Sequence, residues 1–225
     1  MIPFIDVHTH KTNFNLNNTI IVRNILLPDE EIPQQGSVSA GWHPWHINNY
    51  SLFEIRNRLT KVANNGNVIA LGECGIDRAI ETPIQLQTEV FLLHIQIAMQ
   101  VRKPLIVHNV KSYSDLLQIL KSTLIDLPIV LHGYHGTPQQ TEQFTKYNCY
   151  FSVGDYPVSR QNKMNSAINS IPLNRLLLET DESELSIEKI YIRTAEISNI
   201  SVEELKKQIF SNFKTIFGDG LVKPY

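Results

Sequence analysis

The 225-residue sequence lacks any apolar run near the roughly 18–20 residues that a transmembrane helix needs, so we expect no membrane partner. It has only two cysteines, Cys74 and Cys149, far apart in the chain, which favours a reducing cytoplasm and no disulfide framework. No basic region followed by an apolar stretch opens it, so we expect no signal peptide. Charge is balanced, with 20 Lys and Arg against 22 Asp and Glu, which excludes a protein that binds nucleic acid by neutralising many phosphates.

Eight short apolar runs rich in β-branched residues, each bounded by Pro, Gly, Asn or Asp, are typical of buried parallel strands. They cover residues 4–8, 19–27, 37–42, 68–73, 104–108, 128–132, 150–154 and 175–181. Amphipathic segments typical of helices follow from residue 51 onward, at 51–66, 83–103, 112–124, 137–147, 160–170 and 201–217. With no repeat or linker, this alternation predicts an α/β fold, a somewhat reduced TIM-type (β/α)8 barrel forming a single domain over residues 1–225.

Two connections near the start of the chain are too short for the usual helix. Residues 11–18 separate His10, at the end of the first strand, from the second run, and residues 28–36 separate the second run from the third. A parallel crossover usually needs a dozen or more residues. We therefore predict that the second strand runs antiparallel to its neighbours, joined to them by two helix-free loops.

Histidines and carboxylates end most of these apolar runs. His8 and His10 are two residues apart and so lie on one face of the first strand, with Asp6 on the same face to orient a histidine. In a (β/α)8 barrel the carboxyl ends of the strands form one rim, where active sites lie. Burying this many polar groups without partners would cost free energy, and binding of a divalent metal would offset that cost. The convergent residues are His8, His10, Glu73, His108, His132 and Asp181.

The order of the motifs resembles the TatD-like metal-dependent hydrolases of the amidohydrolase superfamily. The resemblance extends from Asp6 to Gly218, and Gln87 and Phe91 also match. The motifs are DVHTH (6–10), GWHP (41–44), GECGID (72–77), LIVH (105–108), HGYHG (132–136), LLLETD (176–181) and NFKTIFG (212–218).

The resemblance implies a centre of two divalent metal ions. His8 and His10 would hold one ion, and His108 and His132 the other. Glu73 would bridge the ions, and Asp181 would bind the first ion and act as general base for the attacking water. Imidazole-rich coordination suits Zn, Mn, Co or Ni better than Mg, and the sequence does not choose among them.

Three further residues are candidates for substrate binding, each with a plainer alternative. His43 in GWHP would face substrate or cap a loop, and His135 would contact a phosphate or leaving group or stay on the surface. Lys111 stands roughly where family members carry a basic residue, but a solvated lysine at the start of a helix explains it as well.

Aromatic residues and the remaining histidines allow simpler interpretations. Trp42 and Trp45 flank His43 and would either stack on a base or ring or pack as structural aromatics. His94 lies within an amphipathic segment, and we expect it and His46 to be structural. Cys74 alternates away from its neighbouring glutamate and is expected to pack as a small apolar residue.

Some segments depart from the family pattern. The helix that usually follows the first strand is missing, and residues 182–193 read as a loop without the family's Pro-rich segment. Residues 132–137 read HGYHGT instead of the usual His-Cys-Phe-x-Gly. The metal-ligand motifs are retained while the loops that frame the substrate differ.

The resemblance implies a metal-dependent hydrolase, most simply a phosphodiesterase or deoxyribonuclease acting on nucleic-acid ends. The alternatives are a hydrolase of small esters, amides or phosphoesters at the same site, and a catalytically silent metal-binding scaffold. The expected partner is thus a nucleic-acid end or small phosphoester, with no obligatory protein partner and a monomeric or weakly oligomeric state.

Overall fold

The structure is a computed structural model that describes residues 2–12, 18–156 and 161–218. The chain divides into two compact units, a first unit of residues 1–23 and 132–225 and a second unit of residues 24–131. The strand β2 (Thr19–Leu26) crosses the boundary in sequence. The single domain expected from the sequence stays a prediction, and the two units are described in turn.

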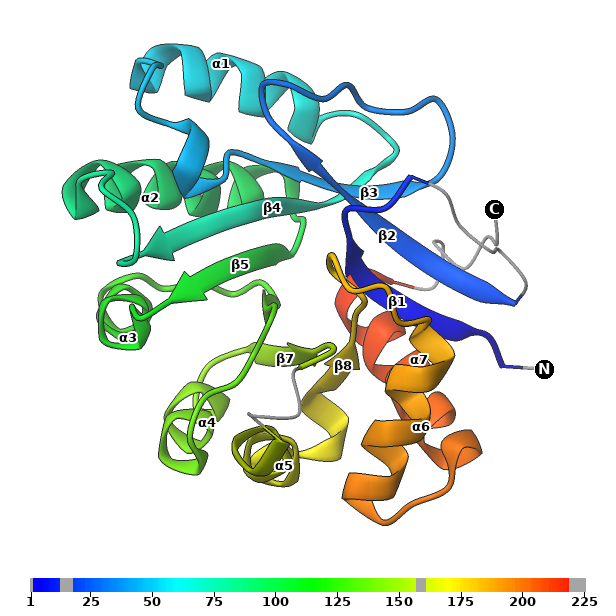
Figure 1. The fold of residues 1–225 in the computed structure, drawn as a ribbon. Helices are drawn as coiled ribbons and strands as arrows, with labels where there is room; N and C mark the ends of the chain where they lie inside the picture. The colour runs from blue at the N-terminus through cyan, green and yellow to red at the C-terminus, as the bar shows by residue number, and fades with distance from the viewer. Residues whose placement is uncertain (1, 13–17, 157–160, 219–225) are drawn as a thin grey trace. The chain divides into compact units, whose positions relative to one another are not determined.

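The second unit holds four parallel-paired strands with helices between them. Its strands are β3 (Ser37–Gly41), β4 (Val68–Asp77), β5 (Leu105–Val110) and β6 (Ile129–Leu131), paired β3 with β4, β4 with β5 and β5 with β6. Its helices are η1 (Pro44–His46), α1 (Leu52–Ala63), α2 (Ile84–Val101) and α3 (Tyr113–Ser122). The helices α1 and α2 pack against each other and on β4 (Figure 1). Helix α1 begins at Ser51, which forms a capping box with Glu54.

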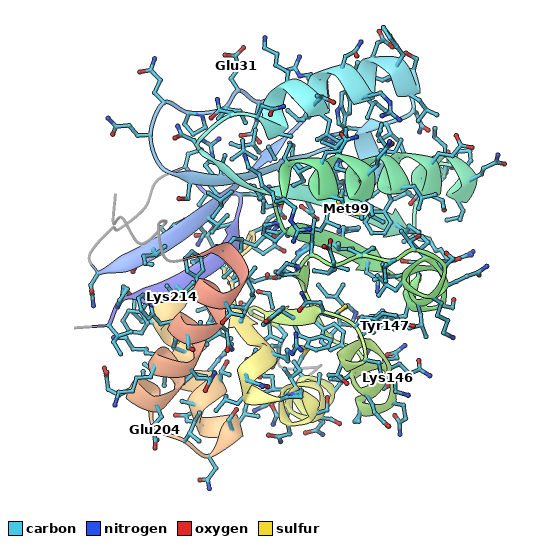
Figure 2. All side chains as sticks on the ribbon, turned by 180° about the vertical axis from the view of Figure 1, so that it is seen from behind. Glu31, Met99, Lys146, Tyr147, Glu204 and Lys214 are labelled. Atoms are coloured by element: carbon cyan, nitrogen blue, oxygen red, sulfur yellow. The ribbon has the colours of Figure 1, made fainter. Side chains whose placement is uncertain are left out.

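The first unit combines the two ends of the described chain. It contains β1 (Phe4–Thr9), β7 (Cys149–Val153) and β8 (Leu176–Leu178), with β7 and β8 paired in parallel. Its helices are α4 (Pro138–Thr145), α5 (Gln161–Ser170), η3 (Leu173–Arg175), α6 (Ile187–Ser198) and α7 (Val202–Phe217). Both α6 and α7 cover β1 and β8 (Figure 1). The exposed carboxylate of Glu31 in the second unit points away from the ribbon (Figure 2), whereas that of Glu204 in the first unit folds back to accept from the N–H of Ser201 at the start of α7.

The fold class predicted from the sequence is confirmed. A strand lies in each of the eight predicted runs, helices alternate with strands from α1 onward, and the strand pairs described within each unit are parallel. This is the pattern of the TIM-type (β/α)8 class. Within the described residues, no helix is both long enough and apolar enough to span a bilayer.

The predicted antiparallel direction of the second strand is wrong. Strand β2 pairs with β1 in parallel, with Phe4 opposite Thr19 and Asp6 opposite Ile21. The rule of a dozen residues applies to crossovers that hold a helix. Six residues of strand span only about 20 Å, and the nine residues between β1 and β2 reach about 30 Å when extended, so a connection of this length can return to a parallel strand without needing a helix. The missing helix predicted for this connection concerns mainly residues 13–17, which lie outside the described residues.

The segment expected as a loop after Asp181 contains the start of a helix. Helix α6 begins at Ile187, and its buried positions include Ile190, Tyr191 and Thr194, at helical spacing. The Tyr191 hydroxyl accepts a hydrogen bond from the main-chain N–H of Ile5 at 3.0 Å, which ties this helix to β1. A departure from the family's loop pattern therefore does not imply a lack of regular structure here.

Two features of the core matter for later arguments. Both cysteines are buried, and burial raises the pKa of the Cys149 thiol to about 12, so they pack as apolar residues, as expected for Cys74. Gly75 of β4 has a φ of +143°, and a Cβ there would collide with the carbonyl oxygen of His108 on β5. Glycine at this position lets the two strands approach closely.

Candidate metal centre

In the first unit, three potential ligands lie close together. They are His8 of β1, His10 directly after β1, and Asp181, three residues after β8. The Nε2 atoms of His8 and His10 lie 3.7 Å and 3.5 Å from Oδ1 of Asp181. One ligand atom from each lies within 4.8 Å of the others, close enough to hold one ion. His8 is fully buried, whereas the Asp181 side chain is 41% exposed, so this group opens to solvent at its carboxylate.

The backbone holds Asp181 in an unusual conformation. Its φ is 50°, in the left-handed region that non-glycine residues seldom occupy. Its N–H donates to the carbonyl of His8 at 2.9 Å, and its own carbonyl accepts from the N–H of His10 at 3.3 Å and from the Thr9 hydroxyl at 3.1 Å. The end of β1 and the residue that follows it, His10, therefore fix the main chain of the carboxylate.

Asp6 holds Thr180, and its expected role in orienting a histidine stays a prediction. Its carboxylate accepts hydrogen bonds from the N–H of Thr180 at 3.0 Å and from the Thr180 hydroxyl at 2.7 Å. Burial raises the pKa of Asp6 to about 7, against the opposing effect of the Thr180 hydrogen bonds. Asp6 thus anchors the residue next to Asp181 as well as lying on the strand of the two histidines.

Glu179 is a potential ligand that sequence reasoning did not single out. Its Oε1 lies 3.6 Å from Nδ1 of His132 and accepts a 2.6 Å hydrogen bond from the N–H of Gly133. Burial opposes ionisation of Glu179, but the neighbouring His132 ring outweighs it and lowers the pKa of Glu179. Together with Asp181, these two side chains form another group with ligand atoms within 4.8 Å. The sequence feature that could have identified Glu179 is its charged side chain inside the apolar run at 175–181.

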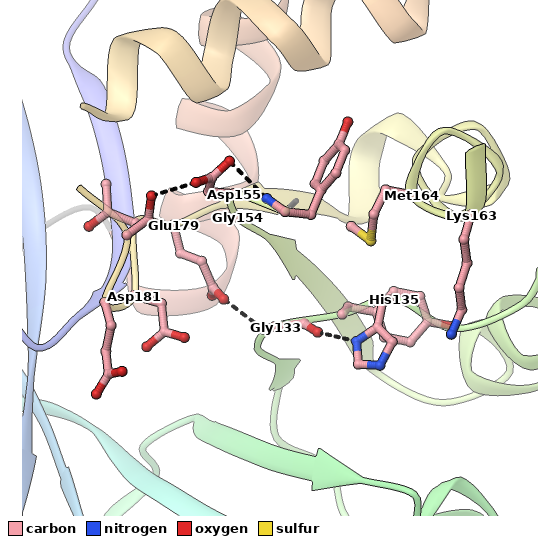
Figure 3. A pocket seen from close by; sticks show the side chains of 13 residues that line it. Gly133, His135, Gly154, Asp155, Lys163, Met164, Glu179 and Asp181 are labelled. Carbon is pink, nitrogen blue, oxygen red and sulfur yellow. Dashed lines mark hydrogen bonds between the residues drawn. The ribbon is translucent and has the colours of Figure 1, made fainter. Parts of the chain in front are cut away.

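A cavity of about 500 Å³ in the first unit opens beside these carboxylates. Glu179 and Asp181 lie on one side of it, and His135 and Lys163 lie on the other (Figure 3). The Nδ1 atom of His135 lies 2.8 Å from the carbonyl of Gly133, which orients the ring. The cavity wall therefore carries carboxylates and basic side chains on opposite sides.

In the second unit, Glu73 lies between two histidines. Its Oε1 is 3.3 Å from Nε2 of His43 and 2.8 Å from Nδ1 of His108. The three side chains are buried, and their ligand atoms lie within 4.8 Å of one another. Glu73 does not end its strand as expected, because β4 continues to Asp77. The register with β5 shifts between Leu71 and Cys74, an irregularity of the kind that re-aims a side chain.

Asn24 of β2 fixes Glu73 at two points. Its Nδ2 donates to Oε2 of Glu73 at 3.2 Å, and its Oδ1 accepts from the Glu73 N–H at 3.0 Å. The hydroxyl of Ser39 donates to the same Oδ1 at 2.9 Å, which sets the orientation of the amide. Sequence reasoning missed Asn24, although a buried amide inside an apolar run was a signal.

Asp77, also not singled out from the sequence, binds the other ring nitrogen of His108. Its Oδ2 lies 3.2 Å from Nε2 of His108 and accepts from the Trp45 indole N–H at 2.9 Å, while Oδ1 accepts from the Ala79 N–H at 2.7 Å. Burial tends to raise the pKa of Asp77, but these hydrogen bonds outweigh it and lower the pKa to about 2. Asp77 is therefore ionised near neutral pH and holds His108 in one orientation.

The hydrogen bonds of His43 indicate its tautomer. Its Nδ1 accepts from the main-chain N–H of Trp45 at 3.2 Å, as the cap of η1. A neutral His43 then carries its proton on Nε2, the atom that faces Glu73. In this state His43 donates a hydrogen bond from Nε2 and has no lone pair there for a metal.

The donor set fits a divalent metal. With Nε2 of His108 donating to Asp77, its Nδ1 turns a lone pair toward Glu73 unless it is protonated, and a cation between the two acceptors would satisfy both. A histidine whose other nitrogen donates to a carboxylate is the usual arrangement of a metal ligand. Imidazole nitrogens with carboxylate oxygens suit Zn, Mn, Co or Ni.

Of the other residues that the sequence singled out, Lys111 is exposed just before α3, and Trp42 is buried. His94 is buried, accepts from the N–H of Trp42 at 3.0 Å and lies 2.8 Å from the carbonyl of Val90, a structural role as expected. Burial lowers the pKa of His94 to about 4, so it is neutral near pH 7.

The fold and these imidazole–carboxylate groups define the class of metal-dependent hydrolases. The model of the TatD-related DNase family matches residues 7–218, and the chain belongs to this family, as the resemblance implied. The chain is 27% identical over 196 residues to the uncharacterized metal-dependent hydrolase YabD of Bacillus subtilis, covering 80% of this chain and 76% of YabD. It is 30% identical over 148 residues to the 3′-5′ ssDNA/RNA exonuclease TatD of Cronobacter sakazakii, covering 64% of this chain and 56% of that one.

The crystal structure of YJJV, a TatD homolog from Escherichia coli, has the same fold. Its TM-score with this chain is 0.85, at 23% identity, and the match covers 97% of this chain and 100% of YJJV. The protein is thus a TatD-family metal-dependent hydrolase with residues able to hold metal.

Proposed function

We propose that this protein hydrolyses phosphodiester bonds at nucleic-acid ends, with Asp181 as the general base. The observation that carries the proposal is the position of Asp181, which belongs to a potential ligand group with His8 and His10 and also lines the 500 Å³ cavity. A general base must reach both the attacking water and the substrate. The Asp181 carboxylate is partly exposed, whereas the His8 side chain beside it is fully buried. The nuclease names among the relatives support the choice of bond.

Two divalent ions are part of the proposal, held as the resemblance implies. His8 and His10 would hold one ion with Asp181, and His108 and His132 would hold the other, with Glu73 as the bridge. Bound there, divalent ions supply Lewis-acid polarisation of the phosphoryl group and a lowered pKa of water. Asp181 takes the proton from the attacking water, and the main-chain bonds to His8 and His10 keep its carboxylate in position.

The cavity also favours an anionic substrate. Lys163 and His135 lie opposite the carboxylates, so a phosphate entering between them would meet the positive charge of Lys163 on its far side (Figure 3). Because Nδ1 of His135 donates to the Gly133 carbonyl, the ring would offer the phosphate a second N–H, on Nε2, in its protonated form. The two basic side chains would bind the substrate phosphate, and His43 would donate from Nε2 to substrate or to Glu73. Lys111 stays a candidate for substrate binding on sequence grounds.

A small phosphoester is the second candidate substrate. The cavity volume of about 500 Å³ lies within the range of small-molecule sites, and a nucleotide end and a small phosphoester present the same group to the ligands. We favour the nucleic-acid end because of the relatives' names.

The test compares wild type with Asp181→Asn and with Glu182→Gln, a matched control that also removes one negative charge from the same cavity wall. Each protein is incubated with an end-labelled single-stranded oligonucleotide, bis(p-nitrophenyl) phosphate and a p-nitrophenyl carboxyester, across Mn, Co, Zn and Mg. We expect mononucleotide release by wild type and Glu182→Gln, and loss of at least about a hundredfold in Asp181→Asn. Hydrolysis of the carboxyester alone, or equal rates in all three proteins, would overturn the proposal.

A further inference from the structure

The two tryptophans of the chain have opposite environments. Trp42 is 1% exposed, whereas Trp45, three residues later, is 58% exposed. Tryptophan is highly buried on average, because exposing the indole forfeits the largest apolar surface of any side chain. The exposure of the Trp45 indole beside a candidate metal group therefore indicates a role other than packing in the core.

Trp45 is exposed but held in place. Its indole N–H donates to Oδ2 of Asp77 at 2.9 Å, and its main-chain N–H donates to Nδ1 of His43 at 3.2 Å. Its ring meets the His43 ring edge to face, with centroids 4.8 Å apart and planes at 86°. The polar edge of the indole is satisfied, so most of the surface left to solvent is apolar ring.

The same contacts place Trp45 next to the ligand group of the second unit. Asp77 binds the Trp45 indole and Nε2 of His108 with one oxygen, and the rings of Trp45 and His108 have centroids 6.3 Å apart. His43 and His108 both contact Glu73. The two histidines that contact Glu73 therefore both have the Trp45 ring as a neighbour, and a molecule bound at Glu73 would have a fixed aromatic surface on the other side of these rings.

We propose that Trp45 is a stacking site for a nucleobase of the substrate. The inference rests on the proposed function, because it assumes that the phosphodiester bound by the ligand group belongs to a nucleic acid. A base has a π-face regardless of its identity, so stacking on an indole binds single strands without sequence preference. The fixed orientation of the ring lowers the entropy lost on binding.

The chain offers a matched control for this site. Phe53 of α1 is 72% exposed and belongs to the same unit, but within the described residues no ring contact or hydrogen bond joins its side chain to Glu73, His43 or His108. Removing either ring removes exposed aromatic surface, and only removal of Trp45 should affect binding of a base.

The first experiment measures binding before turnover. Zn-loaded protein is mixed in a stopped-flow instrument with a short oligothymidylate or with its abasic analogue, and tryptophan fluorescence is recorded before the strand is cleaved. We expect oligothymidylate to quench the emission in wild type and in Trp42→Phe, and not in Trp45→Phe, because the exposed indole is the one that meets the base. Equal quenching by the abasic strand, or no quenching in wild type, would overturn the inference.

The second experiment measures turnover with metal present. For Trp45→Leu we expect KM for the oligonucleotide to rise roughly 5- to 150-fold with little change in kcat, Trp45→Phe to recover part of the loss, and Phe53→Leu to match wild type. Metal content should be unchanged in Trp45→Leu. Lower metal content together with lower kcat would mean that Trp45 only supports Asp77 and His108, which would overturn the stacking role.

The two proposals fail separately. A wild type that quenches with oligothymidylate but cleaves no phosphodiester would contradict the proposed function while supporting the stacking site. A wild type that cleaves the normal and the abasic strand with equal KM would retain the function and overturn the stacking site.

Discussion

Gln87 satisfies both main-chain hydrogen-bonding groups of Asp77. Its Oε1 accepts from the Asp77 N–H at 2.7 Å, and its Nε2 donates to the Asp77 carbonyl at 3.0 Å. Gln87 is fully buried on α2, so this amide fixes the last residue of β4 from the helix that follows it. The carboxylate that orients His108 is thus held through its own backbone.

Asp77→Asn should weaken metal binding without unfolding the protein. The amide still accepts one hydrogen bond, but it no longer presents a carboxylate to Nε2 of His108. Loss of such a partner typically costs 10- to 100-fold in metal affinity, so we expect a decrease of that order in calorimetric titration with Zn or Mn.

A surface aspartate supplies the control for this prediction. Asp115 forms an exposed ion pair with Arg78, with an N–O distance of 2.7 Å, and Asp115→Asn should leave the affinity unchanged. Equal affinities in Asp77→Asn and wild type would mean that His108 is not oriented for a metal.

Replacing His94 should change how stability depends on pH. Its pKa in the folded protein is about 4, against an ordinary histidine pKa of 6.5, so the unfolded chain binds more protons between these values and the wild type loses stability as pH falls through them. His94→Gln lacks this titration. We expect the difference in free energy of unfolding between wild type and variant to shrink by about 2 kcal/mol from pH 7.5 to pH 5.

Urea denaturation at a series of pH values, with EDTA present throughout, measures this difference directly. Comparing the two proteins cancels other titrations, including that of Asp6, whose raised pKa acts in the opposite direction. A difference that stays constant with pH would show that His94 does not titrate as described.

Gly75→Ala should be strongly destabilising. The new Cβ would meet the His108 carbonyl at a φ that L-residues rarely adopt, so β4 and β5 must separate, at a cost of roughly 3 kcal/mol. At Gly66 an added Cβ would have no heavy atom within 4 Å and the φ is not left-handed, so Gly66→Ala should change the midpoint of thermal unfolding little. Similar midpoints for the two variants would contradict the close approach of the strands.

Local patterns of the sequence predicted the strands well and their partners less well. The alternation that places His8 and His10 on one face is a property of consecutive residues; His8 lies in β1, His10 follows its last residue, Thr9, and both rings face Asp181. Helix α6 carries the same kind of signal, in the spacing of Ile187, Ile190 and Tyr191, but comparison with the family's loop pattern obscures it. The direction of β2 depends on where β1 lies, which no local pattern contains.

The missed residues of the candidate site have the same explanation. Asp77 matters because the indole of Trp45 and the ring of His108 meet its carboxylate, and those partners lie 32 and 31 positions away in the chain. Glu179 is fixed by the N–H of Gly133, 46 positions away. A sequence motif can include such residues, but only the folded structure shows which residues they contact.

The discontinuity of the first unit bears on how the protein is made. Thr9 bridges to Asp181, so the ligand group of His8, His10 and Asp181 joins the beginning of the chain to a segment synthesised much later. Contacts of such long sequence separation form late, because a large loop must close before they are gained. During translation the two histidines are therefore synthesised long before their carboxylate partner, and a product that terminates before residue 181 lacks Asp181, the proposed general base.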